Sequence, residues 1–327
     1  MKAVSQKGFT LVEMMVAMVI GLVLVAGVVT LFISSRRSFE IDGNVARMQD
    51  EARFAMQELS RDLSMASYLA EPLIPGTVLQ DATLDLASDC GPAGTPNWMY
   101  QLIDGATGDI TTLSVIDNAA GAAAEAGFSC IDAGEVLAGN DVVAIKRVAG
   151  DALDDDELQE GGAYLRSNGT VGFLFVEPPA MAVAGPWTTW SYRPRIYYIR
   201  NYADTPGDGE PMLCRKTLIA GAPPEVTTEC IARGVERLQI EYGIDSDGDG
   251  NANRYQPDPP ADDIASVVSA RLYLLVRTPD PDRQYTDTRS YNISNADAYE
   301  PGDNFHRRVY SMTLTVHNLR NLRRLGI

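Results

Sequence analysis

The chain has 327 residues, of which 45% are hydrophobic and 22% are charged. This composition excludes a disordered chain, a collagen and a protein with many membrane spans. Its 27 basic and 44 acidic residues give a net charge of −17, and a surface this acidic repels phosphate, so nucleic acid is not an expected partner. The two histidines leave little scope for zinc hydrolysis or imidazole general-base catalysis.

The first predicted element is an apolar helix over residues 9–33, which follows a short basic segment, 1–8, and contains a single charge, Glu13. A helix of this length would extend about 37 Å, long enough to cross a bilayer with some tilt. A secretory signal peptide has a shorter apolar core and a small-residue cleavage site. An ordinary signal anchor does not account for Glu13, because a carboxylate inside the span costs about 2.5–3.5 kcal/mol on insertion scales.

Residues 7–13 read K-G-F-T-L-V-E, and this string resembles the signal of type IV prepilins. The resemblance implies that a prepilin peptidase cleaves the chain after Gly8 and methylates the new N-terminal residue, Phe9. It also implies that Glu13 pairs with the N-terminal amine of a neighbouring subunit during docking, which offsets the desolvation of both charges. The alternative is that Glu13 is a charge tolerated near the cytoplasmic end of the span.

The orientation in the membrane follows from this resemblance and not from charge, because Lys2 and Lys7 precede the span while Arg36 and Arg37 follow it. A prepilin signal implies a single pass through the inner membrane, with the N-terminus in the cytoplasm and the body in the periplasm. After assembly, the chain is expected in the pilus fibre, with the tip as a candidate position.

Apolar residues at steps of three and four predict that the helix continues as an amphipathic segment over residues 34–71. The apolar positions are Ile41, Val45, Met48, Ala52, Ala55, Leu59, Leu63, Ala66 and Leu69. The opposite, polar face is expected to carry Arg47, Asp50, Glu51, Arg53, Glu58, Arg61 and Asp62. Asp42 and Gly43 form a soft spot where a kink or local melting is expected, and Pro72 and Pro75 are expected to end the helix.

Residues 46–69, ARMQDEARFAMQELSRDLSMASYL, resemble the segment after the membrane span in PilW-type minor pilins of type IV pili. Ser64 stands where that family usually has arginine. Residues 234–243, GVERLQIEYG, and the paired segments 267–277 and 307–319 also resemble that family. The resemblance implies an α+β, pilin-like fold, in which a long N-terminal spine helix packs on a C-terminal antiparallel β-sheet domain.

The resemblance also implies a division into parts and a set of partners. The expected parts are the leader peptide (1–8), the transmembrane half of the spine helix (9–33), its amphipathic half (34–71) and a periplasmic β-rich domain (72–327). The expected partners are other minor and major pilins, the prepilin peptidase and the inner-membrane assembly platform, with a tip adhesin as a further candidate.

Short runs of β-branched and aromatic residues predict eight strands within residues 72–327. They are 110–116, 141–148, 171–176, 195–200, 212–219, 235–244, 266–277 and 308–317. In the last of these, Tyr310, Met312, Leu314 and Val316 alternate with polar residues, which predicts that one face of the strand is buried. Long loops rich in Gly, Pro and Asp separate the strands.

Four cysteines occur, at Cys90, Cys130, Cys214 and Cys230, and none lies in a C-x-x-C pair or at metal-ligand spacing. An even number in the oxidising periplasm indicates two disulfides, for which three connectivities are open. We expect the sequential pairing, Cys90 with Cys130 and Cys214 with Cys230. The second bridge would then close a short loop.

A candidate calcium loop occupies residues 245–256, D-S-D-G-D-G-N-A-N-R-Y-Q. Asp245, Asp247 and Asp249 alternate along it and Gly250 follows, as at positions 1, 3, 5 and 6 of an EF-hand-type loop. In such a loop carboxylates converge on the ion, and the glycine makes the sharp turn. The alternative is an acidic turn between two strands that holds no ion.

Two asparagines complete the candidate ligand set. Asn251 would offer its backbone carbonyl, and Asn253 its side chain or a bound water. The twelfth position is Gln256 instead of the usual bidentate glutamate, so a lower affinity is expected, and Asp258 could substitute if the loop bends. Such a site would brace a connection between strands, and no cofactor is required beyond this candidate Ca²⁺.

These features favour a structural protein over an enzyme. The expected function is that of a minor pilin that takes part in priming the assembly of a type IV pilus or in forming its tip. One alternative is a minor pseudopilin of a type II secretion system. Another is a membrane-anchored, calcium-dependent periplasmic binding protein. The sequence contains no G-x-S-x-G, no H-E-x-x-H and no nucleotide-binding loop, so an enzyme is not expected.

Overall fold

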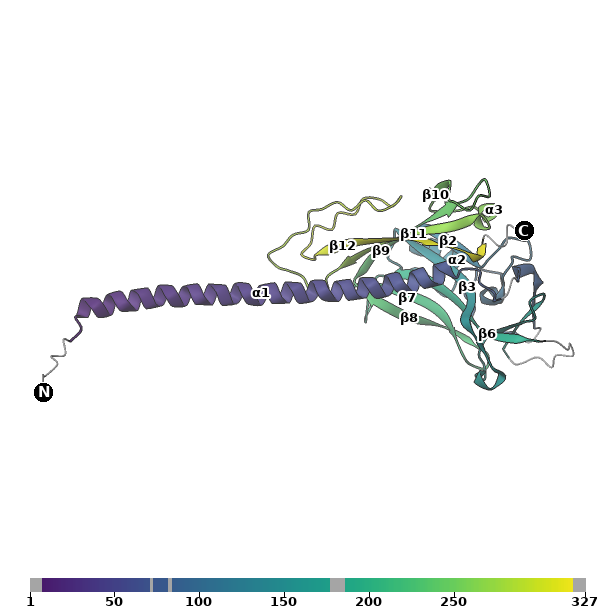
Figure 1. Cartoon of the computed structure of the whole chain (residues 1–327), viewed down its shortest axis with the longest axis horizontal. Helices are drawn as coiled ribbons and strands as arrows, with labels where there is room; N and C mark the ends of the chain where they lie inside the picture. Colours follow the sequence, from purple (N-terminus) through teal and green to yellow (C-terminus); the bar gives the residue numbers. More distant parts are fainter. Residues whose placement is uncertain (1–7, 71–72, 82–83, 177–185, 320–327) are drawn as a thin grey trace. The chain divides into compact units, whose positions relative to one another are not determined.

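The structure, a computed structural model of the chain, describes residues 8–70, 73–81, 84–176 and 186–319 (Figure 1). The contacts divide the chain into two compact units, one up to Arg47 and one from Met48 onward. The first unit consists of the N-terminal part of the first helix, and the second contains the rest of that helix and all the strands.

Helix α1 spans Leu11–Ser64 and is continuous through Asp42 and Gly43, so the expected soft spot does not interrupt it. It contains a segment long and apolar enough to cross a membrane. From Met48 onward, one face of the helix is buried in the second unit. The buried side chains are those of Met48, Ala52, Ala55, Met56, Leu59, Asp62 and Leu63.

The helix ends earlier than its apolar pattern predicts. After Ser64 the backbone turns, and Ser67 and Ala70 adopt positive φ angles of 63° and 73°. The N–H of Ser67 donates to the carbonyl of Lys146, and its hydroxyl lies 2.9 Å from that of Thr112. Contacts with the sheet therefore replace the last predicted turns of helix. Pro72, expected to end the helix, lies outside the described residues.

Eight strands form one sheet in which β6 is central, with β3 on one side and both β4 and β7 on the other. The strands are β1 (Val78–Gln80), β2 (Leu113–Ala119), β3 (Asn140–Leu153), β4 (Tyr164–Ser167), β5 (Gly172–Phe175), β6 (Thr188–Arg200), β7 (Met212–Ile219) and β8 (Glu225–Arg233). All pairs are antiparallel except β1 with β5. The antiparallel domain expected from the sequence is therefore confirmed, with one short parallel pair added.

A second, four-stranded antiparallel sheet has the order β10-β9-β11-β12. Its strands are β9 (Val235–Ile244), β10 (Arg254–Gln256), β11 (Val267–Arg277) and β12 (Arg307–Thr315). The remaining elements are the short helices η1 (Pro75–Thr77), η2 (Trp98–Tyr100), α2 (Gly121–Gly127), η3 (Asp155–Glu157) and α3 (Ala261–Ile264). The α+β fold expected from the sequence, a long N-terminal helix packed on β-sheets, is thus confirmed.

Two adjacent side chains at the start of β3 join the sheets. Asn140 Oδ1 accepts the N–H of Leu238, and Asp141 Oδ2 accepts the N–H of Ile240, each at 2.7 Å. Both side chains are fully buried. They satisfy backbone donors of β9 that would otherwise be buried without partners, so the sheets are held at a fixed register.

The prediction that one face of the last strand is buried is confirmed only in part. Val316, just beyond β12, is buried, but Met312 is 41% exposed and Tyr310 and Leu314 are only partly covered. The reason is position: among the described residues β12 pairs only with β11 and ends the sheet. An alternating pattern reports that one face can be buried, whereas burial also needs an element lying over it.

Candidate functional site

The processing motif lies at the start of α1. Gly8, Phe9 and Thr10 precede the helix, and the Phe9 side chain is 85% exposed. The scissile bond expected between Gly8 and Phe9 therefore lies in non-helical, accessible backbone. A peptidase needs non-helical backbone at the bond that it cleaves, so the local structure is compatible with cleavage there.

Glu13 takes part in a contact that the sequence interpretation missed. Its Oε2 accepts the backbone N–H and the hydroxyl of Thr10, each at 2.9 Å, and the N–H of Glu13 donates to Thr10 Oγ1 at 3.2 Å. This reciprocal arrangement is a capping box, which satisfies free donors of the first helical turn. The spacing Thr-x-x-Glu in the sequence is the signal for this cap.

A buried ionic cluster anchors the second half of α1 to the large sheet. Asp62 is fully buried, and its Oδ1 accepts Arg147 Nε at 2.9 Å and Nη2 at 2.5 Å. Its Oδ2 accepts Arg195 Nη1 at 2.8 Å and the hydroxyl of Tyr197 at 2.5 Å. The sequence interpretation placed Asp62 on the solvent-facing side of the helix, and this was wrong, because β3 and β6 supply its counter-charges.

The electrostatic balance at Asp62 favours the charged form. Burial raises the pKa of its carboxyl, but the positive charges of Arg195 and Arg147, with the Tyr197 hydrogen bond, outweigh burial and lower the pKa below its ordinary value. One turn earlier, Glu58 accepts Arg215 Nη1 at 2.7 Å. Three strands thus contribute arginines to the helix: β3, β6 and β7.

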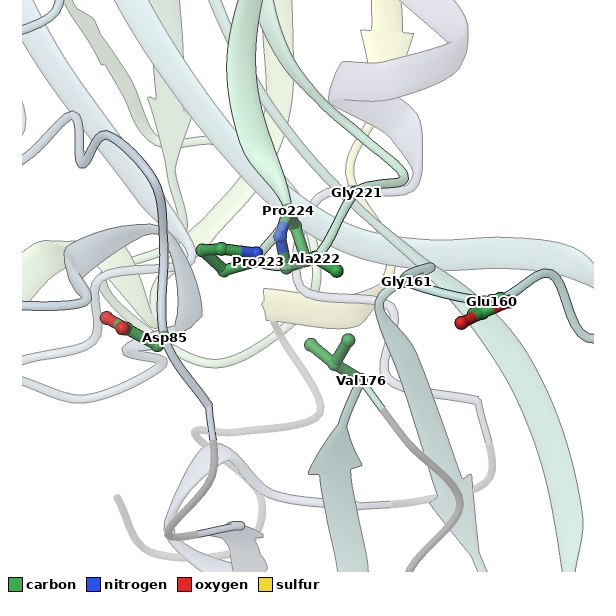
Figure 2. A pocket seen from close by; sticks show the side chains of 8 residues that line it. All are labelled: Asp85, Glu160, Gly161, Val176, Gly221, Ala222, Pro223 and Pro224. Atoms are coloured by element: carbon green, nitrogen blue, oxygen red, sulfur yellow. The ribbon is translucent and has the colours of Figure 1, made fainter.

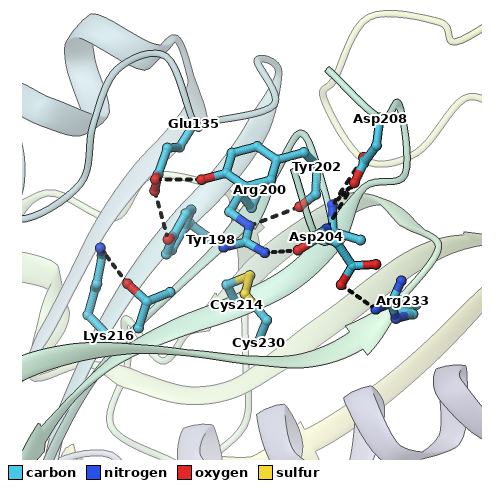
Figure 3. Close-up of a disulfide and its surroundings, with 12 residues drawn as sticks. Glu135, Tyr198, Arg200, Tyr202, Asp204, Asp208, Cys214, Lys216, Cys230 and Arg233 are labelled. Atoms are coloured by element: carbon cyan, nitrogen blue, oxygen red, sulfur yellow. Dashed lines mark hydrogen bonds and ion pairs between the residues drawn. A yellow bond between two sulfur atoms is a disulfide. The ribbon is translucent and has the colours of Figure 1, made fainter. Parts of the chain in front are cut away.

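Both disulfides form with the expected sequential pairing, Cys90–Cys130 and Cys214–Cys230. Cys214 and Cys230 lie opposite one another on β7 and β8 (Figure 3). Cys90 is buried in a core cluster that includes Trp98. The bridges brace separate parts of the sheet domain, and neither cysteine pair is placed to hold a metal.

Charged residues beside the Cys214–Cys230 bridge are engaged in structural contacts (Figure 3). The Tyr202 hydroxyl donates to Glu135 at 2.8 Å, and Arg233 pairs with Asp204 at 2.7 Å. Backbone N–H groups, that of Glu210 foremost, hold the pKa of the Asp208 carboxyl well below its ordinary value. This is the arrangement of a fixed loop and not of an acid–base catalyst.

A cavity of about 250 Å³ lies where the loop at Gly161 meets that at Gly221. Figure 2 shows its two carboxylates, Asp85 and Glu160, on opposite sides, with Val176 between them.

The three aspartates of the candidate calcium loop converge. Asp245, Asp247 and Asp249 can each place one carboxylate oxygen within 4.8 Å of the others. Asp245 is buried, and its carboxylate accepts the N–H groups of Gly248 at 2.5 Å and Gly250 at 2.9 Å. Both glycines adopt positive φ angles, 86° and 94°, which the tight turn requires. An all-oxygen donor set of this kind fits a hard cation.

The other candidate ligands hold the loop closed. Asn253 Oδ1 accepts the N–H of Ser246 at 2.7 Å, and its Nδ2 donates to Asp247 at 3.1 Å. The N–H of Asn251 donates to Asp249 Oδ1 at 2.7 Å. Gln256 lies on β10, where its side chain reaches Asp263 at 3.4 Å, and not in the group of converging carboxylates.

Comparisons with known proteins agree with the sequence interpretation at both ends of the chain. Residues 196–318 match the family Type IV Pilus-assembly protein W, PilW, and residues 4–29 match the Prokaryotic N-terminal methylation motif. The C-terminal part of the chain is thus similar to PilW, and its N-terminus is similar to the prepilin methylation motif. The PilW match covers residues 234–243 and 267–277, whereas 46–69 lies outside both matched ranges. The matched family is one of pilus assembly proteins and not of enzymes.

One solved structure and the curated proteins complete the comparison. The type IV-like pilin TTHA1219 from Thermus thermophilus aligns with 84% of this chain and 97% of its own, at 13% identity and a TM-score of 0.37. None of the curated proteins matches the chain.

Proposed function

We propose that this protein is a minor pilin that is cleaved after Gly8 and takes part in priming a type IV pilus or in forming its tip. The observation that carries the proposal is the presence, in one chain, of a methylation motif over residues 4–29 and a PilW region over 196–318. Helix α1 contains most of the first matched range, and the second covers strands β7 to β12 of the sheet domain.

In this proposal, α1 first holds the chain in the inner membrane, with its body in the periplasm. Cleavage by the prepilin peptidase leaves the apolar segment attached, so the product stays in the membrane until assembly. Phe9 then becomes the N-terminal residue, one helical turn before Glu13. Glu13 pairs with the corresponding amine of a neighbouring pilin, and the pair fixes the axial register because a mispaired charge in an apolar fibre is costly.

Other minor and major pilins and the inner-membrane assembly platform are the proposed partners, with a tip adhesin as a further one. A minor pseudopilin of a type II secretion system would use the same mechanics. The PilW match supports the assignment to a type IV pilus. The pilus assignment predicts a defect in piliation and the pseudopilin assignment a defect in type II secretion, so one experiment that measures both separates them.

The experiment is deletion of the gene followed by complementation with the full chain. A pilus role predicts loss of surface pili, measured by shearing and electron microscopy, with secretion of type II substrates unchanged. Mass spectrometry of the sheared pili from the complemented strain should find this chain at low abundance. Normal piliation together with a secretion defect would instead establish the pseudopilin assignment.

We also propose that the loop of Asp245, Asp247 and Asp249 binds Ca²⁺ as a structural brace. The convergence of three carboxylates supports this, because their mutual repulsion is relieved by a cation. The loop connects β9 to β10, so an ion there would stabilise the edge of the four-stranded sheet. A calcium-dependent binding role for the whole protein would rest on the same loop.

A further inference from the structure

Within the part of the chain that the structure describes, strand β12 ends the four-stranded sheet and pairs along one edge only. It pairs with β11 over nine residues without a register shift, from Ser269 opposite Thr315 to Arg277 opposite Arg307. The side chains of Val309 and Met312, which point to opposite faces of the sheet, are 39% and 41% exposed. The strand is therefore accessible on both faces as well as along its edge.

The hydrogen bonds at the two ends of this pair identify the free backbone groups. The N–H of Thr278 donates to the carbonyl of His306, and the N–H of Val316 donates to the carbonyl of Val268. Bonded and non-bonded pairs alternate in an antiparallel ladder, so the even-numbered residues between these ends bond to β11. Val309, Ser311 and Thr313 therefore direct their N–H and C=O groups away from the sheet.

This edge lacks the features with which proteins usually protect edge strands. β12 contains no proline, no lysine and no bulge, and its charges are confined to one end, at Arg307 and Arg308. By contrast, β8, at an edge of the large sheet, exposes Glu225 and Glu229 and has no large hydrophobic side chain exposed. An unprotected edge nine residues long is a template for another strand.

The charges beside the edge indicate what kind of strand would fit. Arg308 lies over the ring of Tyr310 at 5.6 Å, and Arg53 of α1 acts electrostatically on the same side chain. Among the described residues neither arginine forms an ion pair, and the buried hydroxyl of Tyr310 has no hydrogen-bond partner. Arg308 is exposed, so it offers a positive charge beside this edge that an acidic side chain would complement.

We propose that β12 is a docking site for an extended segment of another protein, which adds a strand to the four-stranded sheet. The segment would bond to the outward backbone groups of Val309, Ser311 and Thr313. It would carry apolar side chains at alternate positions, against Met312, and a carboxylate that pairs with Arg308. Main-chain bonds would supply affinity, and the side chains specificity, as in β-strand addition generally.

The test uses the full chain in cells, with p-benzoylphenylalanine in place of Ser311 as a photo-crosslinker and in place of Thr227 on β8 as the matched control. We expect a crosslink from position 311 that exceeds the control at least tenfold. Mass spectrometry should map it to an extended, Asp- or Glu-bearing segment of a different protein. Arg308→Glu in the same chain should reduce the yield several-fold.

Thr313→Pro removes one outward N–H, a position where an edge strand tolerates proline, and should reduce the crosslink at least tenfold. If this variant melts well below the parent chain, Thr313→Lys serves instead, since it keeps the backbone and adds a charge to the edge. Equal yields at positions 311 and 227, a crosslink to a second copy of this chain or to a helix, or insensitivity to both Thr313 variants would each overturn the proposal.

Discussion

The carboxylate of Asp62 and the guanidinium of Arg147 meet through two hydrogen bonds, of 2.9 and 2.5 Å, and 1% or less of either side chain is exposed. Asp62 belongs to α1 and Arg147 to β3, 85 residues later in the chain. A buried pair of this kind adds little net stability compared with a hydrophobic one, but losing one partner leaves a charge buried without compensation. The pair therefore fixes where the helix sits on the sheet.

Replacement of Asp62 tests this anchor. Asp62→Ala leaves Arg147 buried without its counter-charge and removes the nearer acidic partner of Arg195, so the free energy of unfolding should fall by about 3–5 kcal/mol. The measurement is chemical denaturation of the full chain in detergent. Arg61→Ala, which alters an exposed neighbour, is the control and should change the free energy of unfolding by less than about 0.5 kcal/mol. Equal effects of the two substitutions would mean that the cluster does not hold the helix.

Gly8 is expected to be required for processing. Gly8→Val places a branched side chain on the N-terminal side of the scissile bond, where the peptidase must accommodate the residue. The chain should then remain uncut and about eight residues heavier by mass spectrometry. Detection of Phe9 at the N-terminus of this variant would refute the assignment of the signal.

Glu13 is expected to matter for assembly but not for insertion or cleavage. Glu13→Leu makes the span more apolar, so membrane insertion should be normal, while the partner amine loses its counter-charge. The variant should be cleaved and yet missing from sheared pili in immunoblots.

Thr10→Val is the matched control for Glu13, because it breaks the capping box and keeps the carboxylate. This variant should still be incorporated into pili. A cleavage defect in Glu13→Leu would move the role of Glu13 to peptidase recognition, and equal loss of both variants from pili would assign it to the cap.

Calcium should stabilise the chain by mass action if the aspartate loop binds it, by about 1.4 kcal/mol for each tenfold excess over the dissociation constant. Millimolar Ca²⁺ should therefore raise the melting temperature, and Mg²⁺ should raise it less, because it demands tight octahedral geometry. Asp247→Ala should abolish the response, whereas Asp262→Ala, an exposed acid on α3, should not. An unchanged melting temperature of the parent chain would establish the acidic-turn alternative.

The titration of Asp141 should contribute to the pH dependence of the free energy of unfolding. Burial raises the pKa of this carboxyl to about 8, against the opposing effect of the N–H groups of Asn118 and Ile240. The folded state then holds a proton that the unfolded state has already released, so stability falls as the pH rises from about 4 to about 8, with a slope of up to about 1.4 kcal/mol per pH unit.

Asp141→Asn should remove this component, and the difference in slope between the two proteins is the quantity to measure by denaturation at several pH values. The substitution also leaves one backbone N–H without an acceptor, so the stability at any single pH is not the test. Identical slopes would show that the two N–H groups keep Asp141 ionised in the folded state.

Local patterns made part of this structure predictable. The spacing of Asp245, Asp247 and Asp249 and the even cysteine count are read directly from the sequence, and the structure brings the aspartates together and forms both disulfides as expected. The string around Gly8 and Glu13 is equally local, and the roles assigned to it stay predictions. The strands with β-branched runs were found for the same reason. Each of these inferences needs only the residue types within one element or one loop.

The features that were missed depend on residues far apart in the chain. Asp62 follows the polar spacing of its helix, and its carboxylate can be buried only because Arg147 and Arg195 supply counter-charges. Strand β8 reads as a loop because Thr227, Thr228 and Glu229 suit solvent, and pairing with β7 decides its conformation. Likewise, the exposure of β12 follows from its place in the sheet and not from its alternation.

The Cys214–Cys230 bridge has a mechanical consequence. Glu51 of α1 accepts the N–H of Arg233 at the end of β8, while Glu58 of the same helix binds Arg215 on β7. A pull along the helix axis would thus load both strands of one hairpin simultaneously. The covalent link between directly opposite residues prevents that hairpin from unzipping, so tension must pass onward into β6 and the centre of the sheet.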